Sequence, residues 1–125
     1  MNSSHLAAIL EEIATLPEFA PVAPLTPQSR SGVANTPLHV AAIRGDVSAM
    51  TTLIDAGADI DARGEHGYTS LHEAVGQGHG TGVSLLLSRG ASAHIADDDG
   101  RTPQQLAELL GAHEITRLFH EQQTA

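Results

Sequence analysis

The residues of this chain that could do chemistry are mainly histidines and carboxylates, which bind zinc and transfer protons. The sequence has eight histidines and 15 acidic residues, but it has no cysteine. In three places a histidine directly precedes a glutamate, as in the His-Glu-x-x-His zinc signature. That signature needs a second histidine four residues after the first, and the residues found there are Gly76, Arg117 and Thr124. The zinc signature therefore fails in all three places.

Other catalytic patterns are also incomplete. The glycine-rich stretch 76–82 lacks the last glycine of G-x-G-x-x-G in either frame, and a chain without lysine has no Walker A loop. The acidic run 96–100 would place Ile95 and Leu106 at ligating positions of a calcium loop, where neither side chain can bind the ion. No G-x-S-x-G elbow is present. The sequence thus predicts a protein that is not an enzyme and has no cofactor.

One enzymatic alternative stays open, a small metal-dependent hydrolase that uses some of the His and Glu residues. It requires stoichiometric metal in protein purified without chelators. Elemental analysis of the purified chain would distinguish it from a binding protein.

The bulk composition limits the possible partners. The chain has 125 residues, a formal net charge of −9 and only 2% aromatic residues, so its core must consist of small aliphatic side chains. Such an acidic chain neutralises neither nucleic-acid phosphates nor anionic lipid headgroups. It has no apolar run of the roughly 20 residues that span a bilayer, and no cationic segment before an apolar stretch, as a signal peptide would have. We expect a cytoplasmic monomer that binds neither nucleic acid nor membrane.

The elements that position the candidate residues begin with an N-terminal helix. Leu6, Ile9, Leu10 and Ile13 fall at helical spacing and predict an amphipathic helix over residues 3–16. Four prolines follow within residues 17–27, and they predict an extended proline-rich loop over residues 17–31.

The rest of the chain repeats with a fixed period. Thr36, Thr69 and Thr102 recur at one constant interval, and each begins a short helical pattern that ends at a glycine. A second helical pattern and a turn-rich stretch follow each glycine. Two helices and a turn that recur at such a constant interval are typical of a solenoid.

Residues 31–123 resemble three ankyrin repeats through Thr-Pro-Leu-His-x-Ala-Ala, Gly-Ala-Asp-Ile-Asp-Ala and Asp-Asp-Gly-Arg-Thr-Pro. The resemblance implies an all-α fold, an ankyrin-type α-solenoid of stacked helix-turn-helix repeats with short β-turn tips. It divides a single domain, residues 1–125, into repeats at 32–63, 64–96 and 97–125, the last with a C-terminal cap. Residues 3–16 would be the second helix of a degenerate opening repeat and would cap the stack.

Two departures from the repeat pattern carry expectations. Ala34 stands where the later repeats have Gly67 and Gly100, which predicts an irregular first turn. Gln105 replaces the histidine of the first two repeats, His39 and His72. Equivalent residues of stacked repeats lie one helix spacing apart, roughly 8–10 Å, so two histidines cannot share a zinc ion at about 2.0–2.1 Å. The resemblance implies instead that each histidine bonds its own threonine and the neighbouring turn.

The resemblance also implies a concave binding face, formed by the turn tips and the exposed sides of the first helices. The positions that fall on it by repeat phase are Arg44, Arg63, Glu65, His66, Tyr68, Gln77, Asp98, Asp99 and Arg101, together with Val33, Asn35, Ile43 and Leu109. Tyrosine and arginine often anchor interfaces, so we expect Tyr68 and the arginines to contribute most. The predicted function is a non-enzymatic protein-interaction module, or scaffold, that acts as an inhibitor or adaptor of an unidentified protein partner.

Overall fold

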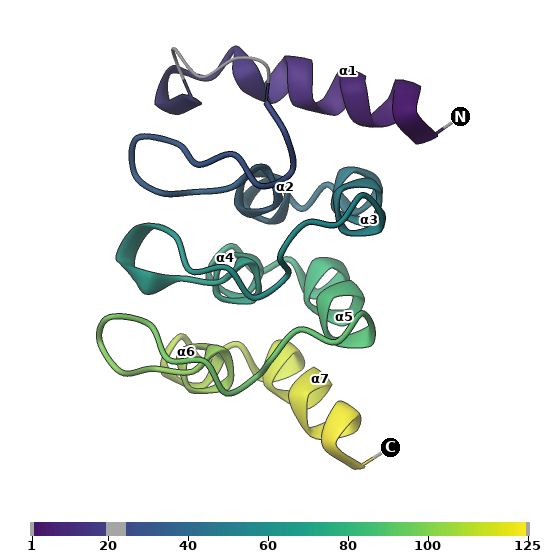
Figure 1. The fold of residues 1–125 in the computed structure, drawn as a ribbon. Helices are drawn as coiled ribbons and strands as arrows, with labels where there is room; N and C mark the ends of the chain where they lie inside the picture. The colour runs from purple at the N-terminus through teal and green to yellow at the C-terminus, as the bar shows by residue number, and fades with distance from the viewer. Residues whose placement is uncertain (1, 20–24, 125) are drawn as a thin grey trace.

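The computed structural model describes residues 2–19 and 25–124, which form seven α-helices and two 3-10 turns (Figure 1). Their bounds are α1 Asn2–Ala14, η1 Pro17–Phe19, α2 Pro37–Arg44, α3 Val47–Asp55, η2 Glu65–Gly67, α4 Ser70–Gly76, α5 Gly80–Ser88, α6 Pro103–Leu109 and α7 His113–Thr124. No strand occurs in these two ranges. In the same ranges, every helix is too short or too polar to cross a membrane.

Three helical hairpins, α2–α3, α4–α5 and α6–α7, are stacked in chain order (Figure 1). The first helices of the hairpins pack on one another to form an inner row, and α3, α5 and α7 form an outer row. The turns that precede the three hairpins, at residues 31–35, 64–68 and 97–101, project to one side as three tips (Figure 1). The predicted all-α solenoid is confirmed, whereas the repeat boundaries stay a prediction.

Each inner helix begins at the threonine that marks the repeat. The Oγ1 atoms of Thr36, Thr69 and Thr102 accept a hydrogen bond from the backbone N–H three residues later. The side chain of that later residue, His39, His72 or Gln105, accepts from the threonine N–H in return, at 3.1, 3.1 and 2.9 Å. These reciprocal bonds satisfy helix-end donors that would otherwise lack a partner.

The two histidines also tie each hairpin to the next. The Nδ1 atom of each accepts the threonine N–H, so the other ring nitrogen carries the hydrogen and donates it. His39 Nε2 lies 2.8 Å from the Tyr68 carbonyl oxygen, and His72 Nε2 lies 2.9 Å from that of Arg101. Burial lowers the pKa of both histidines, which favours the neutral ring that this bonding needs. The structure confirms the double role expected from the sequence, and Gln105 in the last repeat keeps only the local bond.

The core consists of small aliphatic side chains between the two helix rows. Leu38, Leu53, Leu71 and Leu86 are completely buried, and Met50 lies among them. Alanines on the inner helices, such as Ala42 and Ala74, are also fully buried. Their small side chains let neighbouring hairpins pack closely, as the low aromatic content requires.

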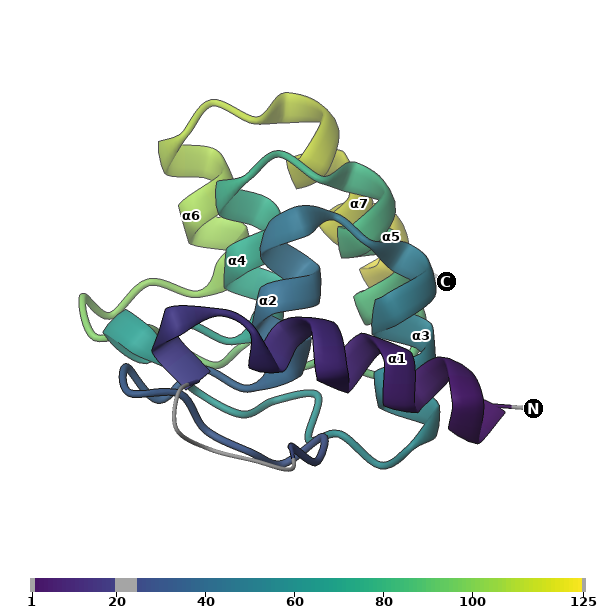
Figure 2. The ribbon, with the colours of Figure 1, turned by 90° about the horizontal axis from the view of Figure 1, so that it is seen from above.

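Helix α1 covers the first end of the stack. It packs on α2 and α3 through Leu10 and Ile13, and Phe19 of the following turn is completely buried. Figures 1 and 2 show that α1 runs crosswise over these two helices. The expected second helix of an opening repeat would run beside α3 instead, as α5 does, so the orientation of α1 differs from that expectation.

The first tip closes with the same hydrogen bond as the other two and has the same left-handed position, so the expectation of an irregular first turn is wrong. At its base Ser31 N–H bonds the Asn35 carbonyl at 2.7 Å, and the equivalent bonds of the later tips are 2.7 and 2.8 Å. Ala34 has a φ of 71°, close to 72° at Gly67 and 80° at Gly100. The neighbouring bonds therefore hold an alanine in the left-handed region, which costs roughly 1–2 kcal/mol.

Replacing Ala34 with glycine should stabilise the protein by about 1 kcal/mol, because glycine adopts this conformation without the Cβ clash. Urea unfolding followed by circular dichroism measures the change. The matched control is Gly100→Ala, where an added Cβ meets no atom within 4 Å but φ is 80°. It should destabilise by a similar amount, and equal stability of all three proteins would contradict the strain at Ala34.

Replacing His72 with glutamine should separate the local bond from the bond between hairpins. Gln105 shows that glutamine can accept from the threonine N–H. A glutamine at position 72 would have no second ring nitrogen to donate to the Arg101 carbonyl, as His72 Nε2 does. We expect a loss of about 1 kcal/mol of unfolding free energy, measured by urea unfolding. In the part of the chain that the structure describes, no tip follows Gln105, so the reverse change, Gln105→His, should alter stability by less than about 0.5 kcal/mol.

Candidate functional site

The predicted binding residues lie in two strips at opposite ends of the inner helices. The tip strip contains Arg63, Glu65, His66, Tyr68, Asp98, Asp99 and Arg101. The helix-end strip contains Arg44 and Gln77, which end or follow α2 and α4. The eight residues of α2 separate the strips by roughly 12 Å at about 1.5 Å per residue. Figure 2 shows the tips on one side of the stack and the helix ends on the other.

The tips are fixed to one another by hydrogen bonds. Asp98 N–H bonds the His66 carbonyl at 3.0 Å, and Arg63 reaches the Asp98 carboxylate at 2.9 Å. Asn35 in the first tip is only 3% exposed, and its Oδ1 accepts from Glu65 N–H at 3.0 Å. The sequence-based placement of Asn35 on the exposed face is therefore wrong, because its side chain connects the first tip to the second.

Tyr68 has a packing role as well as an exposed part. Its ring stacks on His72, with centroids 5.4 Å apart and planes 9° from parallel, and the His66 ring lies 5.8 Å away on a tilted plane. Burial raises the pKa of the Tyr68 hydroxyl, and the negative charges of Asp97, Glu73 and Asp99 add to the shift. The half-buried ring is thus held in one place before any partner arrives.

The arginines expected as anchors all form ion pairs within the chain. Arg44 contacts Glu12 of α1 at 2.6 Å and Arg63 contacts Asp98. Arg101 contacts Asp99 at 3.5 Å. The arginine side chains are 38–48% exposed, and exposed pairs contribute little stability, about 0–1 kcal/mol. A partner carboxylate could replace the acid in any of these pairs at small cost.

Glu73, between the two strips, was missed by sequence reasoning. Glu73 occupies the same repeat position as Val40 and Leu106, which are 5% and 6% exposed. A carboxylate at a position where the other repeats have a buried aliphatic residue is the sequence signal that could have identified it. Burial raises its pKa from 4.5 to about 7, and the charges of Glu65 and Glu18 add to the shift. Within the described residues, no hydrogen bond or ion pair is made to this carboxylate. The inner face therefore has a half-buried acid without a counter-charge.

The described residues do not provide a metal centre. Among them, no three histidine or acidic side chains come close enough together to hold an ion. His39 and His72 use both ring nitrogens in the bonds between hairpins. Nothing in the described chain supports the metal-dependent hydrolase.

Comparison with known proteins identifies the family of this chain. Residues 5–97 match the family described as Ankyrin repeats (3 copies). The chain belongs to the ankyrin repeat family. Repeats of this family are generally protein-protein interaction modules. The match begins within α1 and ends at Asp97, the first residue of the third tip's hydrogen-bonded turn.

Several relatives have the same repeats. An ankyrin repeat-containing protein of Schizosaccharomyces pombe is 34% identical over 88 residues, 70% of this chain and 42% of that protein. Ankyrin repeat and SOCS box protein 16 of Mus musculus is 40% identical over 82 residues, 66% of this chain and 17% of that protein. Protein phosphatase 1 regulatory subunit 27 of Mus musculus is 38% identical over 71 residues, 57% and 46% of the two chains. The chain spans less than half the length of each of these relatives.

The raised pKa of Glu73 predicts a pH dependence of stability. Between pH 4.5 and about 7 the folded state holds a proton that the unfolded state has lost, so this group's contribution falls as pH rises. Glu73→Gln removes that titration. The variant should be more stable than the wild type at pH 8, by on the order of 1 kcal/mol after allowance for solvent screening.

Urea unfolding of both proteins at pH 5 and pH 8 tests this expectation. The stability difference between them should shrink at pH 5, where most of the Glu73 carboxyl groups in the folded protein are protonated. A difference that is the same at both pH values would show that Glu73 is not desolvated in the folded protein.

Proposed function

We propose that this ankyrin-repeat chain binds a protein partner through the concave face formed by the tip strip, the helix-end strip and the inner helices between them. The observation that carries the proposal is the set of hydrogen bonds between the tips. These bonds align the exposed side chains of successive tips before binding, and such preorganisation lowers the entropic cost of association.

The chemistry of the face supports a protein as the ligand. It combines a fixed aromatic ring at Tyr68, exchangeable arginine pairs at the tips, and the uncompensated acid Glu73. Aromatic and arginine side chains in preorganised positions are typical anchors of protein interfaces. The net charge of −9 opposes binding to nucleic acid or to anionic membranes.

Three further parts of the proposal come from the sequence. We propose that the chain acts as a monomer in the cytoplasm, without a cofactor, and that it inhibits its partner or connects it to another protein. An ankyrin stack without catalytic groups influences a partner by covering a surface or by holding two proteins together. The partner's identity decides between these two roles.

The proposal is tested by comparing partner capture by two double variants. Tyr68→Ala with Arg101→Ala removes two expected anchors from the tip strip while keeping the Arg101 carbonyl that His72 bonds. We expect capture from an extract of the source organism to fall at least roughly tenfold, measured by quantitative mass spectrometry at a temperature where both proteins are folded.

The matched control places two alanines on α7, outside both strips. Arg117 and His120 are both exposed there, and Arg117→Ala with His120→Ala should capture the partner as the wild type does. Loss of capture in the α7 variant and retention in the tip variant would move the binding surface to the outer helices.

A further inference from the structure

A histidine ring fills the space between the helix-connecting loops of the first two hairpins. His79 lies half-buried between α4 and α5, and its Nε2 donates to the Ile43 carbonyl oxygen at 3.0 Å. The ring packs directly over the α2–α3 loop, because a Cβ built on Gly45 would lie only 2.8 Å from it. The ring thereby satisfies a carbonyl near the end of α2 that the helix itself leaves free.

The same place between the second and third hairpins contains no ring. Ala112 occupies the position of His79 one repeat later and has no side-chain donor. The loop backbone is otherwise equivalent: Gly45, Gly78 and Gly111 have φ values of 69°, 74° and 69°. A Cβ built on Gly78 would meet no heavy atom of the described chain within 4 Å. The third hairpin therefore leaves open the volume that His79 fills one repeat earlier.

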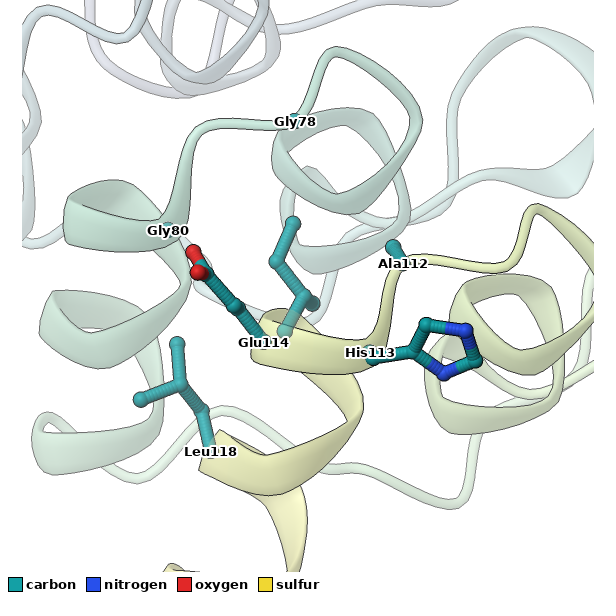
Figure 3. Close-up of a pocket in the computed structure, with 7 residues that line it drawn as sticks. Gly78, Gly80, Ala112, His113, Glu114 and Leu118 are labelled. Carbon is teal, nitrogen blue, oxygen red and sulfur yellow. The ribbon is translucent and has the colours of Figure 1, made fainter.

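An open cavity of about 440 Å³ lies at this position (Figure 3). Its lining includes Gly78, Gly80, Ala112, Glu114, Ile115 and Leu118. The side chain of Glu114 extends from the start of α7 toward Gly80, whereas His113 points away from it. The cavity thus combines aliphatic walls with a carboxylate at one side. Gly76, at the end of α4, is the repeat equivalent of Ile43, whose carbonyl His79 bonds one repeat earlier.

These features specify the chemistry of an occupant. A planar ring with an N–H group can reproduce the bond that His79 makes, and the aliphatic residues Ile115 and Leu118 can pack against its faces. The Glu114 carboxylate adds a negatively charged acceptor that the first interface lacks, because the equivalent residue there is the neutral Thr81. A protonated imidazole has two N–H groups, so it can donate one to a backbone carbonyl and the other to the Glu114 carboxylate.

We infer that this cavity, between the loops 76–80 and 110–114, is a binding site for an imidazole ring, supplied by a histidine side chain of the protein partner. The claim that a partner supplies the ring rests on the proposed function. The claim that the cavity binds an imidazole does not. The cavity lies on the same side of the stack as the helix-end strip, since Gln77 directly precedes Gly78. A bound partner could therefore contact this strip and place a histidine in the cavity.

The site is tested without the partner by titrating the full chain with 4-methylimidazole, which has the ring of histidine. Amide chemical shifts from nitrogen-15 NMR should change saturably at Gly78, Gly80 and Ala112. The control probe 4-methylthiazole has a similar shape but no N–H, and it should bind roughly fivefold more weakly. Equal binding of the two probes, or shifts that do not saturate, would overturn the site.

Two variants make the test specific. Ala112→His should fill the cavity with its own ring, abolish the saturable shifts and raise the thermal midpoint. His79→Ala should open a second site and add a saturable shift at Gly45. Should Ala112→His fail to fold, the His79→Ala titration still decides, since the absence of a new site beside Gly45 contradicts the equivalence of the two places.

The source of the ring is tested separately. Ala112→His should lower capture of the partner, because the partner's histidine finds the cavity occupied. Unchanged capture, together with normal binding of 4-methylimidazole by the wild type, would overturn the assignment to a partner histidine but keep the site. Failure of the probe titration does not affect the tip-variant result, so the two proposals fail independently.

Discussion

The hydrogen bond from each inner-helix histidine to the next tip is the constraint on which the structure depends. One imidazole accepts the N–H of its own helix cap and donates to a carbonyl of the following hairpin. Local helix initiation and the stacking of hairpins therefore depend on the same ring. A solenoid has no contacts between distant repeats, so its geometry must be transmitted from neighbour to neighbour.

The alignment of the tips follows from this chain of bonds. His39 holds the backbone at Tyr68, whose ring stacks on His72, and His72 in turn holds the backbone at Arg101. Side chains from successive tips, each a full repeat apart in the sequence, are thereby brought into one strip. The half-buried Glu73 lies next to His72 on α4. The helix that makes these bonds therefore also has a desolvated carboxylate.

Much of this arrangement could be predicted from the sequence, because the repeat period aligns residues that have the same environment. The threonine caps and the all-helical stack followed from that period, and the roles of His39 and His72 followed from the resemblance to ankyrin repeats. The conformation of Ala34 did not, since residue preference favours glycine there while bonds from neighbouring residues set the backbone. The pairing of Arg44 with Glu12 was also beyond the pattern, because α1 crosses the stack and does not have the threonine-marked pattern of the later repeats. Glu73 and Ala112 could have been found by comparing the repeats position by position and asking which one breaks the consensus.

The two ends of the stack are protected differently, and this has a consequence for motion. Among residues 2–19 and 25–124, helix α1 covers the first hairpin, whereas the third hairpin packs on the second hairpin alone, and Leu109 and Leu110 near its loop are 60% and 53% exposed. Local opening in proteins begins where the fewest apolar contacts must be broken. Fraying should therefore start at α6 and α7, and amide hydrogens there should exchange with solvent before those of α2 and α4. The cavity beside Ala112 lies between the second and third hairpins. A ligand bound there would contact both hairpins and so slow the detachment of the third.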